Sequence, residues 1–205
     1  MKLSRPPYHP STGTMLLILS ILLTGCSESK VWGSLLFHTA PDGMTLSGTY
    51  LPARGPERMA AFVLLHQPGQ PRNRNDFDEL WYGLADQGVA LLAPDLRGHG
   101  ASGEVGDINA LRLDPAGYPV DLRSWLDFLQ HRAADGDFID PDRIAIIGLS
   151  GAASLAAAAV GAGAAHCAVA VSPRLDEVNA LGAGLLADAS GDDDDSAAGG
   201  AEAEQ

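Results

Sequence analysis

The chain has 205 residues, of which 46% are hydrophobic and 6% aromatic, a composition typical of one folded globular domain rather than a disordered or fibrous chain. Its 13 basic and 26 acidic side chains give a formal charge of −13, which argues against a nucleic-acid partner bound through clustered Lys and Arg. The only two cysteines are Cys26 and Cys167, so a disulfide framework is excluded. We expect no metal and no organic cofactor.

Residues 1–25 have the pattern of an export signal. Lys2 and Arg5 precede an apolar run from Met15 to Leu23. That run is much shorter than the roughly 20 residues that a membrane-spanning helix needs, but it suits the core of a signal peptide.

The segment Leu23-Thr24-Gly25-Cys26 resembles a bacterial lipobox, in which the cysteine is lipidated and becomes the first residue of the mature protein. We therefore expect Cys26 to be a membrane anchor on a tether of residues 26–31. Because Ser27 follows it where inner-membrane retention usually has Asp, the resemblance implies the outer membrane. An ordinary signal peptide with a chance cysteine is the alternative.

After residue 31 the sequence alternates strand-like and helix-like segments, the pattern of an α/β fold with a mostly parallel sheet. Apolar runs and alternation predict strands over residues 35–39, 45–51, 61–66, 89–93, 143–147, 167–171 and 184–187. Helical spacing of apolar residues predicts helices over residues 76–87, 122–129 and 152–160. We expect a folded domain over residues 32–190 and an acidic low-complexity tail over residues 191–205.

A sharp turn is predicted at Ser150, between the apolar strand that ends near Gly148 and the Ala-rich helix that begins near Ala152. The pattern resembles a nucleophile elbow, which needs small residues two before and two after the serine because the backbone is crowded there. Ala152 departs from the usual G-x-S-x-G. The alternative is that Ser150 only caps the helix.

A second segment is more specific. Residues 88–102, GVALLAPDLRGHGAS, look like the strand and loop of the α/β-hydrolase superfamily, in its serine-aminopeptidase (S33)-like and dienelactone-hydrolase-like branches. Residues 63–69 resemble the strand end and oxyanion loop of that superfamily. Residues 140–144 resemble the segment that precedes its elbow strand. The resemblance covers about residues 46–172 and implies an α/β-hydrolase-like domain that lacks the last strand and helix.

The resemblance implies a serine hydrolase that transfers an acyl group from a small-molecule ester to water, with Ser150 as the nucleophile. The developing oxyanion would be held by the N–H of Gly151 and by an N–H of the loop after His66. If the family spacing places that second donor on Pro68, there is no N–H to give. Gln67 is then the expected donor, with Gly69 as the alternative.

The triad acid would lie at Asp193 or Asp194, because residues 185–195 resemble the family's late strand and acid loop. The run of aspartates at 192–195 also fits the start of a solvated tail. The triad histidine should follow the acid, yet His166 is the last histidine of the chain and precedes it. His66 and His99 are the substitutes to consider, although the family gives both of them structural roles.

Three further expectations concern side chains outside this triad. Asp95 is expected to organise its loop by accepting backbone hydrogen bonds, and Cys167 to be a small buried side chain in a strand. The three tryptophans, Trp32, Trp81 and Trp125, are expected to pack in or beside the core.

Without a histidine, the alternative function is a non-catalytic envelope lipoprotein derived from a hydrolase, or a truncated gene product.

Overall fold

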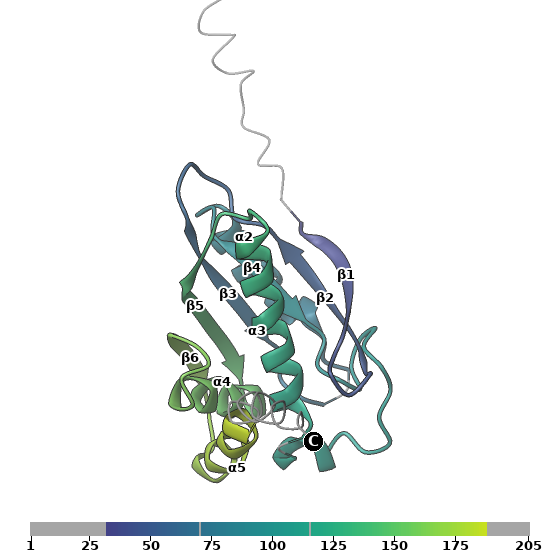
Figure 1. The fold of residues 1–205 in the computed structure, drawn as a ribbon. Coiled ribbons are helices and arrows are strands. Elements are labelled where there is room, and N and C mark those ends of the chain that lie inside the picture. Colours follow the sequence, from purple (N-terminus) through teal and green to yellow (C-terminus); the bar gives the residue numbers. More distant parts are fainter. Residues whose placement is uncertain (1–31, 70, 115, 188–205) are drawn as a thin grey trace, which may run out of the picture. The chain divides into compact units, whose positions relative to one another are not determined.

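A six-stranded sheet with the strand order β1-β2-β4-β3-β5-β6 is the centre of the computed structural model, which describes residues 32–69, 71–114 and 116–187 (Figure 1). The first two strands pair antiparallel with each other, and β2 pairs antiparallel with β4, whereas β4, β3, β5 and β6 run parallel. The expected α/β class with a mostly parallel sheet is confirmed. The strands are β1 (Ser34–Thr39), β2 (Thr45–Leu51), β3 (Met59–Leu65), β4 (Ala90–Pro94), β5 (Ile139–Leu149) and β6 (Cys167–Val171).

The central strands β3 and β4 are apolar along their whole length because both of their faces are covered. Every residue of β4 is buried, as are Val63, Leu64 and Leu65 of β3. The antiparallel pair β1 and β2 is joined by a turn at Pro41-Asp42-Gly43, in which the Gly43 N–H donates to the Ala40 carbonyl. These strands and their order place the carboxyl ends of β3, β4, β5 and β6 along one edge of the sheet.

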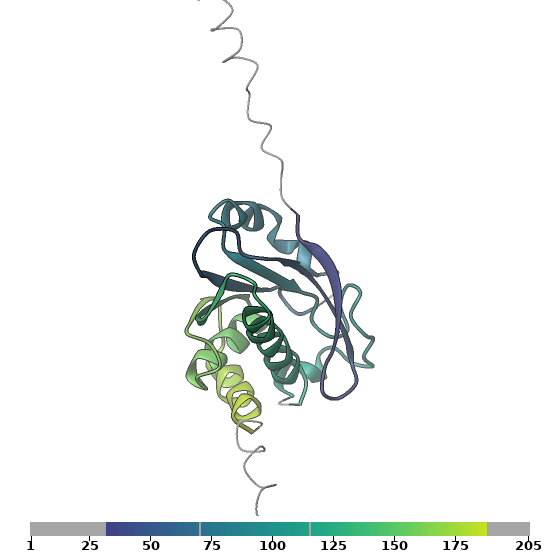
Figure 2. The ribbon, with the colours of Figure 1, turned by 45° about the horizontal axis from the view of Figure 1, so that its top comes forward.

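Both faces of the sheet are covered by helices, and one face carries more of them than the other (Figures 1 and 2). On one face a short 3-10 turn, η1 (Arg74–Phe77), leads into α2 (Asp78–Ala85), whose Trp81 is buried against β3 and β4. The other face carries the main core. Its helices are α3 (Tyr118–Ala134), α4 (Gly151–Gly161) and α5 (Leu175–Ala187), and a second 3-10 turn, η2 (Ala110–Leu113), precedes α3.

Two sequence expectations are wrong. Residues 184–187 belong to α5 and not to a strand, because Val178, Leu181 and Leu185 lie at helical spacing and pack against the main core. Cys167 is exposed, since β6 is the outermost described strand and only one of its faces carries helices.

Other expectations fall partly or wholly outside the described residues. These are the signal peptide of residues 1–25, the anchor Cys26 on its tether, the acid Asp193 and the tail of residues 191–205. Of the tryptophans, Trp81 and Trp125 are buried as expected, whereas Trp32 is half exposed and stacks on Trp81. Among the described helices, none has the length and apolar character needed to cross a bilayer.

Candidate active site

Ser150 lies at a strained turn between β5, which ends at Leu149, and α4, which begins at Gly151. Its φ of 55° and ψ of −119° are unfavourable for a residue with a side chain, and Ser172 is the only other non-glycine residue with a positive φ in the described ranges. The Ser150 side chain makes no capping hydrogen bond to α4. A capping role therefore does not explain this serine.

The close approach of α4 to β5 explains the small residues on either side of the turn. A Cβ on Gly148 would lie 2.7 Å from the carbonyl carbon of Ala152 and 2.9 Å from the Cα of Ala153, so only glycine fits. Ala152 is itself buried in the core, where its methyl group is accommodated. The departure from G-x-S-x-G at Ala152 is thus compatible with the turn.

Backbone hydrogen bonds tie this turn to the neighbouring strand and helix. The N–H of Ser150 donates to the carbonyl of Val171 at 2.9 Å, and the carbonyl of Ser150 accepts from the N–H of Ala153 at 2.9 Å. Gly151 is the first residue of α4, a position whose N–H has no carbonyl partner inside the helix. Such an N–H can stabilise a negative charge that develops next to Ser150.

The loop after β3 supplies one remaining backbone donor. Pro68 has no N–H, and the N–H of Gly69 donates to Nε2 of His99 at 2.7 Å. Of the three residues after His66, only Gln67 is left to provide an oxyanion donor. The N–H of Gly69 is thus engaged by His99, and the oxyanion role of Gln67 stays a prediction.

Each ring nitrogen of His66 and of His99 already makes a hydrogen bond to the backbone. Nε2 of His66 accepts from the N–H of Leu96 at 3.0 Å, so Nδ1 carries the proton and donates to the Gln67 carbonyl at 2.9 Å. Nε2 of His99 accepts from Gly69, so its Nδ1 donates to the Arg97 carbonyl at 3.0 Å. Burial also lowers the pKa of His66, although its hydrogen bond to Gln67 opposes this. These two imidazoles hold loops together and have no nitrogen to offer Ser150.

The other described histidines lie elsewhere. His166 is exposed at the start of β6, where its backbone N–H donates to Ile144, and this is the opposite end of the sheet from Ser150. His38 belongs to β1, at the far edge of the sheet, and its Nε2 lies 2.6 Å from Oγ of Ser124. His131 borders the same surface pocket as His38. None of the five histidines in the described residues is placed to act as a base for Ser150.

Asp95 is the centre of a buried network at the end of β4. Its carboxylate accepts hydrogen bonds from Oγ of Ser47 at 2.7 Å, from the N–H of Arg74 at 2.9 Å and from the N–H of Ala101 at 3.0 Å. The guanidinium of Arg74 also pairs with it. The expected loop-organising role is confirmed, and its charged partner is Arg74, which sequence analysis did not single out.

Arg97 forms a separate buried ion pair beneath the same loop. Its guanidinium donates two hydrogen bonds to the carboxylate of Asp121 on α3 and a third to Asp42 at 2.9 Å. The hydrogen bonds and charge of Asp121 raise the pKa of Arg97 against the opposing effect of burial. The RGHG segment of this loop therefore has a structural function, because it joins the turn after β1 to α3.

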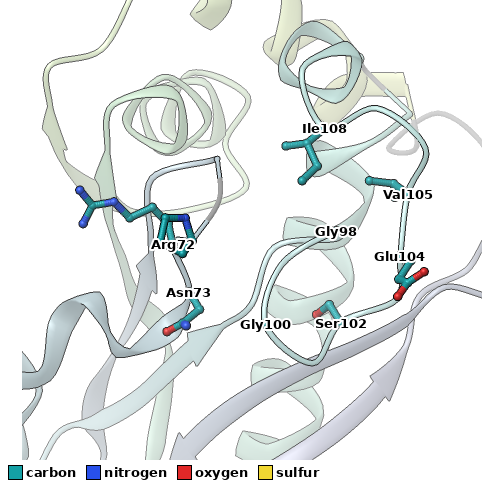
Figure 3. Close-up of a pocket in the computed structure, with 9 residues that line it drawn as sticks. Arg72, Asn73, Gly98, Gly100, Ser102, Glu104, Val105 and Ile108 are labelled. Atoms are coloured by element: carbon teal, nitrogen blue, oxygen red, sulfur yellow. The ribbon is translucent and has the colours of Figure 1, made fainter.

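A pocket of about 430 Å³ lies between the loops that follow β3 and β4 (Figure 3). Arg72 and Asn73 line it from the first loop, and Glu104, Val105 and Ile108 line it from the second. Its position at the carboxyl ends of parallel strands is where α/β sheets bind ligands, but Ser150 is not part of its lining. No cluster of three or more His, Cys, Asp or Glu side chains arranged to hold a metal is present in the ranges described.

Comparison with known proteins identifies the family of this chain. The family model described as "Alpha/beta hydrolase family" matches residues 62–203. The esterase Pf2001 from Pyrococcus furiosus is similar in structure, with a TM-score of 0.55 and 24% sequence identity over 71% of this chain and 53% of that chain. The hypothetical protein PA2218 from Pseudomonas aeruginosa has a TM-score of 0.50 and 25% identity over 64% of this chain and 39% of its own.

The chain thus spans about half the length of the esterase that it resembles. A comparison with curated proteins gave no match. The family match covers more than half of the chain and includes the β3 loop, the loop after β4 and the turn at Ser150. The chain belongs to the alpha/beta hydrolase family.

Proposed function

We propose that this protein is a serine hydrolase that transfers an acyl group from a small-molecule ester to water, with Ser150 as its nucleophile. The observation that carries the proposal is the strained backbone of Ser150, whose hydroxyl makes no cap to α4 at the carboxyl edge of the sheet. Strain of this kind persists at functional sites because the surrounding structure holds it in place.

In the proposed reaction, Oγ of Ser150 bonds to the ester carbonyl carbon, and the carbonyl oxygen becomes an oxyanion between the N–H groups of Gly151 and Gln67. Collapse of this intermediate breaks the bond to the alcohol, which leaves with the serine proton, and water then hydrolyses the acyl-enzyme. Asp193 is proposed as the triad acid. An S33-like or dienelactone-hydrolase-like affiliation is proposed from the GVALLAPDLRGHGAS motif at residues 88–102.

Slow turnover is part of this proposal. His66 and His99 have no free nitrogen, and none of the described histidines is placed to act as a base for Ser150. Enzymes stripped of triad members retain about 10³-fold to 10⁴-fold catalysis over water from the oxyanion hole and substrate binding. Because the ring nitrogens of His66 and His99 are all hydrogen-bonded, these two histidines also favour the second candidate function, which is that of a non-catalytic protein derived from a hydrolase.

We further propose that Cys26 is lipidated after removal of residues 1–25 and that the domain is tethered to the bacterial outer membrane. The lipobox-like segment at residues 23–26 supports this. Metabolic labelling with a palmitate analogue should mark the wild-type protein and leave a Cys26→Ala variant unlabelled. Equal labelling of both proteins would exclude Cys26 as the anchor.

The hydrolase proposal is tested by labelling the full-length protein with a fluorescent fluorophosphonate, which reacts only with an activated serine. The expected result is covalent labelling that is lost in Ser150→Ala and after heat denaturation. Ser34→Ala is the matched control, because Ser34 is an exposed serine on β1 at the opposite edge of the sheet. A folded wild-type protein that does not label would reject the hydrolase and leave the non-catalytic candidate.

A further inference from the structure

The loop that follows β3 begins beside Ser150. In the parallel pairing of β3 with β5, Leu65 lies opposite Gly148. Gln67 and Ser150 each come two residues later, so they follow neighbouring strands at the same level. Neighbouring strands are roughly 4.8 Å apart, so the Gln67 backbone starts its loop within reach of a group bound at Ser150. The course of this loop therefore decides where the Gln67 N–H points.

Hydrogen bonds at three places join this loop to the loop after β4. Two of them are the bonds of the His66 and His99 imidazoles, which lie near the start and the middle of the loop. The third place is the end of the loop, where Arg74 at the start of η1 binds the carboxylate of Asp95 directly after β4. Of the three, this one joins two charged side chains.

Arg74 binds Asp95 in two ways. Its backbone N–H donates to Oδ1 at 2.9 Å, and its guanidinium pairs with Oδ2. The Asp95 side chain is fully buried and only 19% of the Arg74 side chain is exposed, so water screens this pair little. Oδ2 also accepts from Oγ of Ser47 on β2 and from the N–H of Ala101. Asp95 is therefore held by β2 and by its own loop, and Arg74 attaches the end of the β3 loop to this fixed point.

The backbone hydrogen bond alone does not require an arginine. Any residue except proline at position 74 can supply the N–H, and the Asn73 side chain already caps η1 by accepting from Asn75. The guanidinium adds a charge-assisted contact that is directional and removed from water. The Arg74 side chain is thus the group that fixes the end of the β3 loop relative to β4.

We propose that Arg74 is a positioning residue for the reaction at Ser150. Acting through Asp95, it fixes the end of the β3 loop and thereby keeps the Gln67 N–H directed at the developing oxyanion. Arg74 does not touch the substrate in this role. The inference rests on the proposed hydrolase function and on Gln67 as an oxyanion donor.

The test compares acylation of the full-length protein by p-nitrophenyl benzoate and by its thiono analogue, in which sulfur replaces the carbonyl oxygen. Sulfur accepts hydrogen bonds poorly, so the thionoester gains little from oxyanion donors. Release of p-nitrophenol is followed by absorbance, and each rate is divided by the uncatalysed rate in the same buffer. The ratio of the two rate enhancements measures the contribution of the oxyanion donors, and a smaller fraction of folded protein does not change this ratio.

Three substitutions separate positioning from folding. Arg74→Met removes the charge and leaves Asp95 buried without its partner. The double variant Arg74→Met/Asp95→Asn removes both charges, so that neither is buried alone, and it carries the test where the single variant does not fold. Arg58→Met is the matched control, since Arg58 is an exposed arginine before the amino end of β3. Circular dichroism and urea denaturation establish which variants are folded.

In both Arg74→Met variants the ester enhancement should fall by about tenfold to hundredfold, because an oxyanion donor is misplaced, while the thionoester enhancement should change by less than about twofold. Arg74→Lys keeps the positive charge and should recover most of the ester enhancement, and Arg58→Met should behave like the wild type. An unchanged ratio in the double variant, or equal losses for both esters, would overturn the role of Arg74 alone. A wild-type protein that shows no acylation dependent on Ser150 would overturn the hydrolase proposal and this inference with it.

Discussion

Nε2 of His99 accepts a hydrogen bond of 2.7 Å from the backbone N–H of Gly69, and this bond links the loop after β4 to the loop after β3. The other ring nitrogen of His99 donates to the carbonyl of Arg97. One buried imidazole therefore fixes the spacing of two loops next to the candidate site, and it also engages the backbone N–H of Gly69.

Replacement of His99 by alanine should lower the free energy of unfolding by about 1 to 3 kcal/mol, because it leaves the Gly69 N–H and the Arg97 carbonyl without this partner. The measurement is urea denaturation followed by far-UV circular dichroism. His131→Ala is the control, since His131 is exposed and its loss should change stability by less than about 0.5 kcal/mol. Equal effects of the two substitutions would contradict the linking role of His99.

Alanine substitutions at two glycines with positive φ distinguish the stability cost of backbone strain alone from the cost of strain combined with a steric clash. Gly100 (φ 54°) has the carboxyl group of Asp95 where a Cβ would lie, whereas Gly43 (φ 84°) has open space around that position. Gly43→Ala should cost about 1 to 2 kcal/mol, the penalty of a left-handed residue. Gly100→Ala should cost at least about 2 kcal/mol more, because Asp95 must move and lose its buried hydrogen bonds. Similar denaturation midpoints for the two variants would refute this difference.

Stability should fall as the solution is acidified through the range in which histidine titrates. Burial holds the pKa of His66 below its ordinary 6.5, so below that pH the unfolded chain binds a proton that the folded protein does not. The free energy of unfolding should decrease by up to about 1.4 kcal/mol per pH unit for this group, starting near pH 6.5. His38, whose pKa burial also lowers, contributes with the same sign.

The measurement is urea denaturation between about pH 5.5 and pH 8, above the range in which most carboxylates titrate. His66→Asn should be less stable overall and should show a smaller slope with pH than the wild type, because the group that titrates is gone. A His38→Asn variant gives the second contribution separately. If the wild type and His66→Asn have the same slope, His66 is not the source of the pH dependence.

Sequence reasoning was most successful where one local pattern decides one local structure. The apolar runs of β3 and β4 gave central strands, and Gly148, Ser150 and Ala152 together gave the turn that the structure shows. It failed at residues 184–187, where a short apolar run fits a strand and a helix equally well and only the packing of α5 decides between them.

The contacts that shape the site were harder to foresee because they join residues far apart in the sequence. Arg74 with Asp95 and Arg97 with Asp121 carry no local signature, although charged residues in a loop beside a buried carboxylate were a usable signal. The exposure of Cys167 was missed for a related reason. The sequence of β6 is apolar like that of a central strand, and its place at the edge depends on the strand order alone.

Exposure of β6 makes Cys167 reactive in the folded protein. In a Cys26→Ser variant, which leaves one thiol, Ellman's reagent should modify Cys167 without denaturant and at a rate close to that of the urea-unfolded chain. Reaction only after unfolding would contradict the exposure of Cys167 in the folded protein. Cys167→Ser should have the same stability as its parent within about 0.5 kcal/mol, because the side chain makes no buried contact.

The turn at Ser150 requires a residue without a side chain at position 148, which Gly148 provides. In Gly148→Ala the new methyl group would meet backbone atoms of Ala152 and Ala153, which no side-chain rotation can relieve, so the first turn of α4 must shift away from β5. The expected loss is about 2 to 3 kcal/mol of stability, with loss of fluorophosphonate labelling even at temperatures where the variant is folded. Gly161→Ala, at the other end of α4 with open space around its Cβ, should keep both stability and labelling. If Gly148→Ala labels like Gly161→Ala, close packing of the helix against the strand is not what presents Ser150.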